Sequence, residues 1–205
     1  MILTDVEPVG SGGSPPVNNW LIRILDSVFA SKPKDPAPVI TKPLCTPDPA
    51  VLLACKIAQH YEGLFLKPYL DPAGIPTIGW GSTYYENGTR VTMQDPEITE
   101  ARAKILLYTK MEGFVSIVDQ YVDVPLNVSD TASLADLVYN IGPTEFEGST
   151  LLHLLNTGSR TGAEEQFPLW DRGGGQVLTG LEERRKTEQT LFETGNLVFY
   201  TPNQV

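Results

Sequence analysis

The chain has 205 residues, of which 41% are hydrophobic and 20% charged, and its net charge is -10. This length predicts one domain with a buried core and room for an appendage. The acidic balance and the lack of any basic run exclude the footprint that neutralises nucleic-acid phosphates, so we expect no nucleic-acid partner. The run WLIRILDSVFA is too short to span a bilayer, and the opening MILTDVEPVGSGGSPP does not resemble a signal peptide. We therefore expect neither a membrane span nor a secretory signal.

Residues 1–47 form a tail rich in proline and glycine, a composition typical of linkers. Within it, apolar residues recur at helical spacing over about residues 18–30, which predicts a short amphipathic helix. The apolar side chains are Trp20, Leu21, Ile24, Leu25, Val28 and Phe29. The pattern is compatible with a helix that docks on its own domain and with one that docks in the groove of another protein, such as a virion component.

Residues 48–205 predict an α+β domain with a helical lobe and a small sheet lobe. The stretch DPAVLLACKIAQHYEG offers an aspartate N-cap, a proline at the first helical position and a closing glycine, so a helix should end beside Glu62. The next 29 residues, FLKPYLDPAGIPTIGWGSTYYENGTRVTM, predict an antiparallel sheet of about three strands. Four helical segments follow, each of the last three closed by glycine. RGGGQV, at 172–177, is expected to be a flexible turn.

Cysteine and histidine are too sparse to predict a metal site. Cys45 and Cys55 favour two free thiols, one of them packed on a helix; a disulfide that ties the tail to the first helix is the alternative. His60 and His153 lack companions at metal-ligand spacing. We expect no metal and no cofactor.

The stretch EGLFLKPYLDPAGIPTIGWG contains the residues best suited to catalysis. Hydrolysis of a glycosidic bond needs a proton donor and a second carboxylate that attacks the sugar or activates water. Glu62 and Asp71 form the obvious pair, and Thr77 on the returning strand could reach a water held by Asp71. An aspartate in DPAG also fits an ordinary turn, so the spacing alone leaves both interpretations open.

The same stretch closely resembles the active-site signature of the phage-type lysozymes, the bacteriophage endolysin family of glycoside hydrolases. That signature pairs a glutamate, an aspartate nine residues on and a threonine six further, and Glu62, Asp71 and Thr77 match these intervals. LADLVYNIGPTEFEGSTLLHLLNTG and VLTGLEERRKTEQTLF also resemble family segments, so the likeness covers about residues 48–195. The resemblance implies a lysozyme-like fold.

The resemblance further implies an inverting muramidase that cuts the β-1,4 bond between N-acetylmuramic acid and N-acetylglucosamine in peptidoglycan. Glu62 would protonate the leaving oxygen, while Asp71 and Thr77 would orient and activate a water. An arginine from the carboxy-terminal region would hold the glutamate, with Arg184 preferred over Arg185. The alternative is a surface ion pair between these arginines and Glu182 or Glu188.

The family's sugar groove would correspond here to Gly81, Tyr139, Asn140 and Ser149. An aromatic ring next to an amide suits stacking and acetamide recognition, although core packing is the alternative for Tyr139. One departure is Ser82, which stands where many relatives carry a histidine, so the ion pair of that histidine is missing.

Two routes to the substrate are compatible with this pattern. The protein would be a lysozyme carried in a virion tail or a free endolysin that leaves the host cytoplasm, and in both cases it would act in the periplasm or cell wall. The 47-residue appendage favours the virion-bound form. The alternative of another class is an inactive module that keeps the lysozyme fold for docking.

Overall fold

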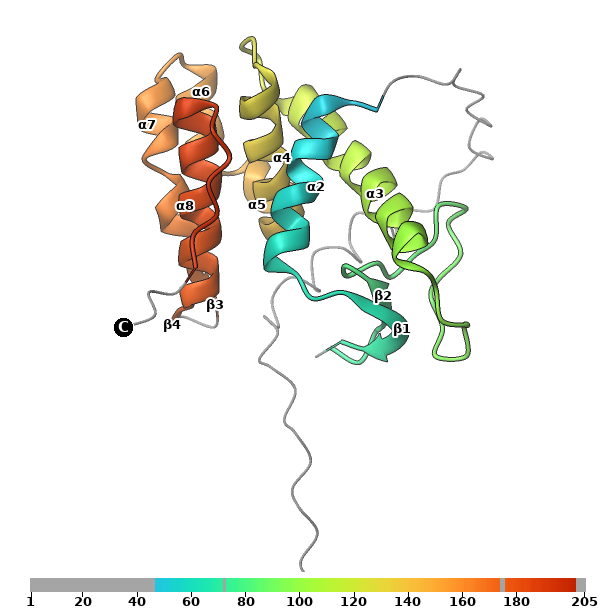
Figure 1. The fold of residues 1–205 in the computed structure, drawn as a ribbon. Coiled ribbons are helices and arrows are strands. Elements are labelled where there is room, and N and C mark those ends of the chain that lie inside the picture. The colour runs from blue at the N-terminus through green and yellow to red at the C-terminus, as the bar shows by residue number, and fades with distance from the viewer. Residues whose placement is uncertain (1–46, 72, 174–175, 202–205) are drawn as a thin grey trace, which may run out of the picture.

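The computed structural model describes residues 47–71, 73–173 and 176–201 (Figure 1). The helix expected over residues 18–30 and Cys45 lie outside the described residues. A helical lobe and a small sheet lobe make up the structure, and α3 (Glu100–Tyr121) runs from the sheet into the helices. The expected α+β, lysozyme-like class is confirmed. Among the described residues, no helix is both long and apolar enough to cross a membrane.

Helix α2 (Pro49–Tyr61) begins and ends where the sequence predicts. The Asp48 side chain accepts hydrogen bonds from the amides of Ala50 and Val51, and Pro49 occupies the first turn, where its missing N–H costs nothing. At the other end, Glu62 leaves the helix with an extended backbone, φ -100° and ψ 146°. The chain therefore turns directly from Glu62 toward the sheet.

The sheet lobe contains two paired strands instead of the expected three. Strand β1 (Phe65–Leu70) pairs antiparallel with β2 (Pro76–Gly79). In place of a third strand in this lobe, the isolated bridges Ile78↔Ser82 and Tyr84↔Arg90 form. Gly79 and Gly81 have φ of 65° and 80°, left-handed conformations that bend the backbone away from a regular ladder. The aromatic and β-branched residues after Gly81 thus predicted a strand that the turn geometry prevents.

The four expected helices are present in the helical lobe, together with shorter elements. The four are α3, α4 (Val128–Ile141), α6 (Thr150–Asn156) and α8 (Thr179–Thr194). The additional elements are α5 (Pro143–Glu147), α7 (Arg160–Glu164), the 3-10 helix η1 (Phe167–Trp170), β3 (Arg172–Gly173) and β4 (Gln176–Val177). Strands β3 and β4 pair antiparallel, so the flanks of RGGGQV form a small hairpin where we expected only a flexible turn.

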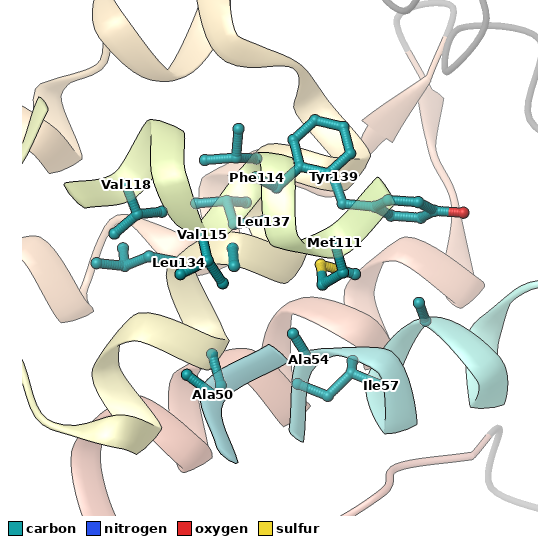
Figure 2. Packing of buried hydrophobic residues seen from close by; sticks show 14 of the residues in the cluster. Ala50, Ala54, Ile57, Met111, Phe114, Val115, Val118, Leu134, Leu137 and Tyr139 are labelled. Atoms are coloured by element: carbon teal, nitrogen blue, oxygen red, sulfur yellow. The ribbon is translucent and has the colours of Figure 1, made fainter. Parts of the chain in front are cut away.

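Helix α4 is the centre of the core, packed against α2, α3 and α8. Figure 2 shows apolar side chains of α2, α3 and α4 meeting there, among them Ile57, Met111 and Leu137. Eleven of its 14 residues are buried, including the charged Asp136. Because α4 is surrounded on several sides, each buried polar group on it must find its partner inside the protein.

Candidate active site

Glu62 lies at the junction of α2 and the sheet lobe, with its side chain 23% exposed. Its backbone N–H donates to the carbonyl of Ala58, which closes the last turn of the helix. Its Oε1 accepts a hydrogen bond of 2.6 Å from Nη1 of Arg184, on α8. The glutamate is thus fixed from two sides while part of its carboxyl group stays open to solvent.

Asp71 follows β1 directly and is 6% exposed. Its Oδ1 accepts hydrogen bonds from the amides of Ala73 (2.8 Å) and Ile75 (2.9 Å), the side-chain turn that the DPAG sequence favours. Oδ2 lies 3.4 Å from the Thr77 hydroxyl, which also donates to the Ile75 carbonyl at 3.0 Å. Because a hydroxyl has one proton and the second contact is shorter, Oδ2 keeps most of its capacity to accept a proton or a water. Asp71 therefore stabilises the turn with one oxygen and keeps the other available.

Tyr69, on β1, is influenced by the charges of both carboxylates, although no sequence pattern singled it out. Burial, together with the charges of Glu62 and Asp71, raises the pKa of Tyr69 to about 12. Its ring packs on Phe65 of the same strand, with centroids 4.2 Å apart. Both carboxylates therefore disfavour ionisation of the same phenol. The available signal was strand alternation, which places residues 65 and 69 on one face.

Lys110, on α3, is a second residue that the sequence did not single out. Its Nζ donates to the carbonyl of Gly81 at 2.8 Å and lies 5.1 Å from the centroid of the Tyr139 ring. Burial lowers the pKa of Lys110 to about 8, although the charge of Glu62 opposes this shift. The site thus contains a cation that loses its proton in a mildly alkaline range.

The four residues expected to bind sugar are mostly occupied by structural contacts. Tyr139 is only 2% exposed and its hydroxyl donates to the Trp80 carbonyl at 2.7 Å, so it belongs to the core (Figure 2). The Ser149 hydroxyl caps α6 by accepting from the amide of Leu152. Gly81 is bound through its carbonyl by Lys110, as described above.

Asn140 is also buried, with an exposed fraction of 3%. Its Nδ2 has no hydrogen-bond partner among the described residues. A buried amide donor without a partner is costly, and the hydrogen-bonding capacity of this nitrogen stays unused within the described structure.

Arg184 lies almost entirely inside the protein, with its side chain 2% exposed. Its Nε and Nη2 donate to the two oxygens of Asp136 at 2.8 Å each, and Nη1 reaches Glu62. Burial lowers the pKa of Arg184, but the carboxylates of Asp136 and Glu62 outweigh it and raise the pKa well above its usual value. The guanidinium is therefore charged at every relevant pH.

Arg185 points to a different partner, Glu188, at 2.6 Å, and both side chains are 0% exposed. The expected pairing with Glu188 therefore forms, but the alternative was wrong to place it at the surface. The sequence analysis did not identify Asp136. Its position inside the largely apolar run SLADLVYNI could have indicated a buried ion pair, because a buried charged residue needs a partner.

The described ranges contain no cluster of three or more histidine, cysteine, aspartate or glutamate side chains that could hold a metal ion. Cys55 is a buried free cysteine on α2. Burial, followed by the charges of Asp136 and Glu112, raises the pKa of Cys55 to about 12. The thiol is thus protonated and behaves as a small apolar side chain.

Comparison with known proteins agrees with this geometry. The phage lysozyme family model matches residues 59–188, inside the range expected from the sequence. The chain is 35% identical over 142 residues to the endolysin of Acyrthosiphon pisum secondary endosymbiont phage 1, covering 67% of this chain and 93% of that protein. It is 37% identical over 134 residues to the endolysin of Salmonella phage P22, covering 65% and 90%.

Among solved structures, the endolysin of Escherichia coli O157:H7 phage FAHEc1 superposes with a TM-score of 0.64 at 31% identity, covering 73% of this chain and 94% of that one. The chain belongs to the phage lysozyme family. It is a glycoside hydrolase of the lysozyme type, and its substrate is peptidoglycan.

Proposed function

We propose that the protein cleaves the β-1,4 bond between N-acetylmuramic acid and N-acetylglucosamine with inversion at the anomeric carbon. In this mechanism Glu62 donates a proton to the leaving oxygen. Asp71, assisted by Thr77, orients a water on the opposite face of the sugar ring and accepts its proton. Both carboxyl groups are regenerated when the proton returns to Glu62 through solvent.

The state of Asp71 is the observation that carries this proposal. Its Oδ1 is occupied by two backbone amides, whereas Oδ2 has only the long Thr77 contact. The two amide donors fix the orientation of the carboxyl group. A carboxylate held in this way suits a base that positions a water, and its free oxygen is the one beside the threonine.

The stereochemistry of the first product tests the proposal. Proton NMR of fresh peptidoglycan digests should show the α-anomer first, because water attacks the face opposite the leaving group. An initial β-anomer would mean that Asp71 attacks the sugar itself and forms a covalent intermediate. A digest without any released saccharide would favour the inactive docking module.

We also propose that the protein is carried in the virion tail and that residues 18–30 bind a virion protein. Support comes from the sequence: the tail lies outside the family match at residues 59–188 and contains an amphipathic pattern between linkers. A free endolysin that crosses from the host cytoplasm to the wall is the alternative. Purified phage particles probed with an antibody against the lysozyme domain would distinguish the two.

A further inference from the structure

Asp136 is a carboxylate enclosed in the middle of the most buried helix. Its side chain is 0% exposed and both of its oxygens are bound by Arg184, from Nε and Nη2 at 2.8 Å each. This two-point contact leaves Nη1 of the same guanidinium to donate to Glu62 at 2.6 Å. Arg184 therefore lies as a bridge between Asp136, which is fully buried, and Glu62, which is partly open to solvent.

An arginine in this place creates a chemical conflict. A general acid must be protonated to act, whereas a cation within hydrogen-bonding distance favours the ionised carboxylate. Arg184 acting alone would thus hold Glu62 in the form that cannot donate a proton. The conflict disappears if a second negative charge is fixed on the other edge of the guanidinium, and Asp136 occupies that edge.

We infer that Asp136 is a positioning residue that holds Arg184 against Glu62 and balances its charge, so that Arg184 orients the Glu62 carboxyl group without keeping it ionised. This inference rests on the proposed role of Glu62 as the general acid. It assigns to Asp136 an influence on the pH dependence of the reaction, beyond its contribution to the fold.

The other titratable groups around Glu62 do not supply this balance. From β1, Tyr69 is affected by the charges of both Glu62 and Asp71; from α4, Tyr139 is affected by that of Glu62. Burial raises the pKa of both phenols, so they are neutral in the working range. From α3, Lys110 is a further cation below a pH of about 8, which increases the need for a compensating negative charge.

Glu188 is the second carboxyl group near the guanidinium, but it is a weaker counter-charge. It lies 3.5 Å from Nε of Arg184 and is closer to Arg185, at 2.6 Å. Burial raises the pKa of Glu188 well above its usual value, although Arg185 opposes this effect. The nearby Cys55 thiol is neutral and supplies no negative charge. Asp136 is therefore the principal negative partner of Arg184 in the interior.

Asp136→Asn tests the inference, because the amide keeps the shape of the side chain and removes its charge. The measurement is kcat/KM on purified peptidoglycan across pH. We expect the alkaline limb of the profile to move to lower pH by about one unit, since Arg184 then favours ionised Glu62 without opposition. A uniform loss of activity with an unmoved limb would show a purely structural role and overturn the inference.

Asp130→Asn is the matched control on the same helix. Asp130 is also buried and also binds an arginine at two points, Arg160 at 2.7 and 3.0 Å, and this pair takes no part in the contacts of Glu62. The same substitution should leave the alkaline limb in place. An equal displacement in both variants would attribute the effect to general destabilisation and would contradict the assignment to Asp136.

A double variant, Asp136→Asn with Arg184→Gln, keeps the test decisive even if the single variant does not fold. Removing one partner of a buried pair leaves an uncompensated charge, whereas removing both does not. We expect the double variant to have its alkaline limb at the wild-type pH, because the balanced pair contributes no net charge. A rise of about one pH unit or more would mean that Arg184 had acted on Glu62 unopposed. Absence of hydrolysis by the wild-type protein, in contrast, would refute the proposed function itself.

Discussion

The hydroxyl of Tyr61 lies 2.6 Å from Oγ1 of Thr187, which joins the last residue of α2 to the middle of α8. The same hydroxyl contacts the carbonyls of Glu183 and Tyr200 at 3.1 Å each. One phenol thus fixes the helix end that carries the adjacent Glu62 to the helix that carries Arg184. The position of the proposed acid therefore depends on a hydroxyl whose contacts are with α8 and the segment that follows it.

Tyr61→Phe should therefore lower both stability and activity. Removing the hydroxyl deprives several half-buried groups of a partner, and we expect a loss of about 1 to 3 kcal/mol in the free energy of unfolding. Urea unfolding of the two proteins measures this difference. A change of only a few tenths of a kcal/mol would mean that water replaces the phenol at no cost.

Glu62→Gln should abolish wall hydrolysis while leaving the fold intact. The amide preserves the shape and can still accept from Arg184, but it cannot donate the catalytic proton, so the rate should fall by at least about 10² to 10⁴. Zymography and a turbidity assay on purified cell wall measure the loss, and circular dichroism checks the fold. Near-normal turnover by the folded variant would refute the assignment.

Glu97→Gln is a suitable control for that substitution. Glu97 forms an exposed pair with Lys67 at 3.5 Å, and such pairs contribute little to stability. The variant changes a glutamate to glutamine outside the contacts of Glu62. It should hydrolyse the wall at the wild-type rate.

Lys110→Met should change the pH dependence of stability in a defined direction. The pKa of Lys110 is about 8 in the folded protein, below its ordinary value of 10.5, so the unfolded chain binds more protons between these values. The wild-type protein must therefore gain stability as pH rises from about 8 toward 10.5. Methionine has no charge to desolvate, and the variant lacks this gain.

The measurement is urea unfolding of wild type and Lys110→Met at neutral and at alkaline pH. The measured quantity is the unfolding free energy of the variant minus that of the wild type. This difference should be larger at neutral pH than at alkaline pH, because only the wild type loses a buried charge when Lys110 is deprotonated. The variant also loses the hydrogen bond from Lys110 to the Gly81 carbonyl, which lowers its stability at both pH values. A stability difference that does not vary with pH would contradict the prediction.

Local signals predicted the parts of this fold that depend on neighbours in sequence. Asp48 and Pro49 define the start of α2 through a cap and a fixed φ, and both act within one turn. The spacing of Glu62, Asp71 and Thr77 led to the family through its resemblance. The prediction of a third strand was wrong because composition cannot reveal that Gly79 and Gly81 adopt positive φ.

The residues that sequence reasoning missed depend on partners far along the chain. Asp136 meets Arg184 across 48 residues, and Lys110 meets Gly81 across 29. Periodicity can show that Asp136 lies on an apolar face, but it cannot name the buried cation that makes the position tolerable. For Tyr139 the two sequence interpretations were equally plausible, and its burial together with its contact with the Trp80 carbonyl favours the core.

The last prediction is that residues 1–47 form a targeting segment that the catalytic domain does not need for activity. The described domain begins with its own cap: Asp48 holds the first turn of α2, and its backbone N–H donates to the Tyr108 hydroxyl at 2.8 Å. Deletion of residues 1–42 leaves these contacts in place. Hydrolysis of purified peptidoglycan should consequently be unchanged.

The same deletion should remove the protein from assembled phage particles. Burial of the apolar side chains of residues 18–30 is worth roughly 1.5 to 3 kcal/mol each before ordering costs, enough for stable docking on a partner. Trp20→Ala with Phe29→Ala in the full chain is the milder version, and it should weaken incorporation without changing activity. Particle purification followed by immunoblotting measures incorporation. If the truncated protein unfolds or loses activity, the segment belongs to the lysozyme domain, and the free endolysin becomes the better interpretation.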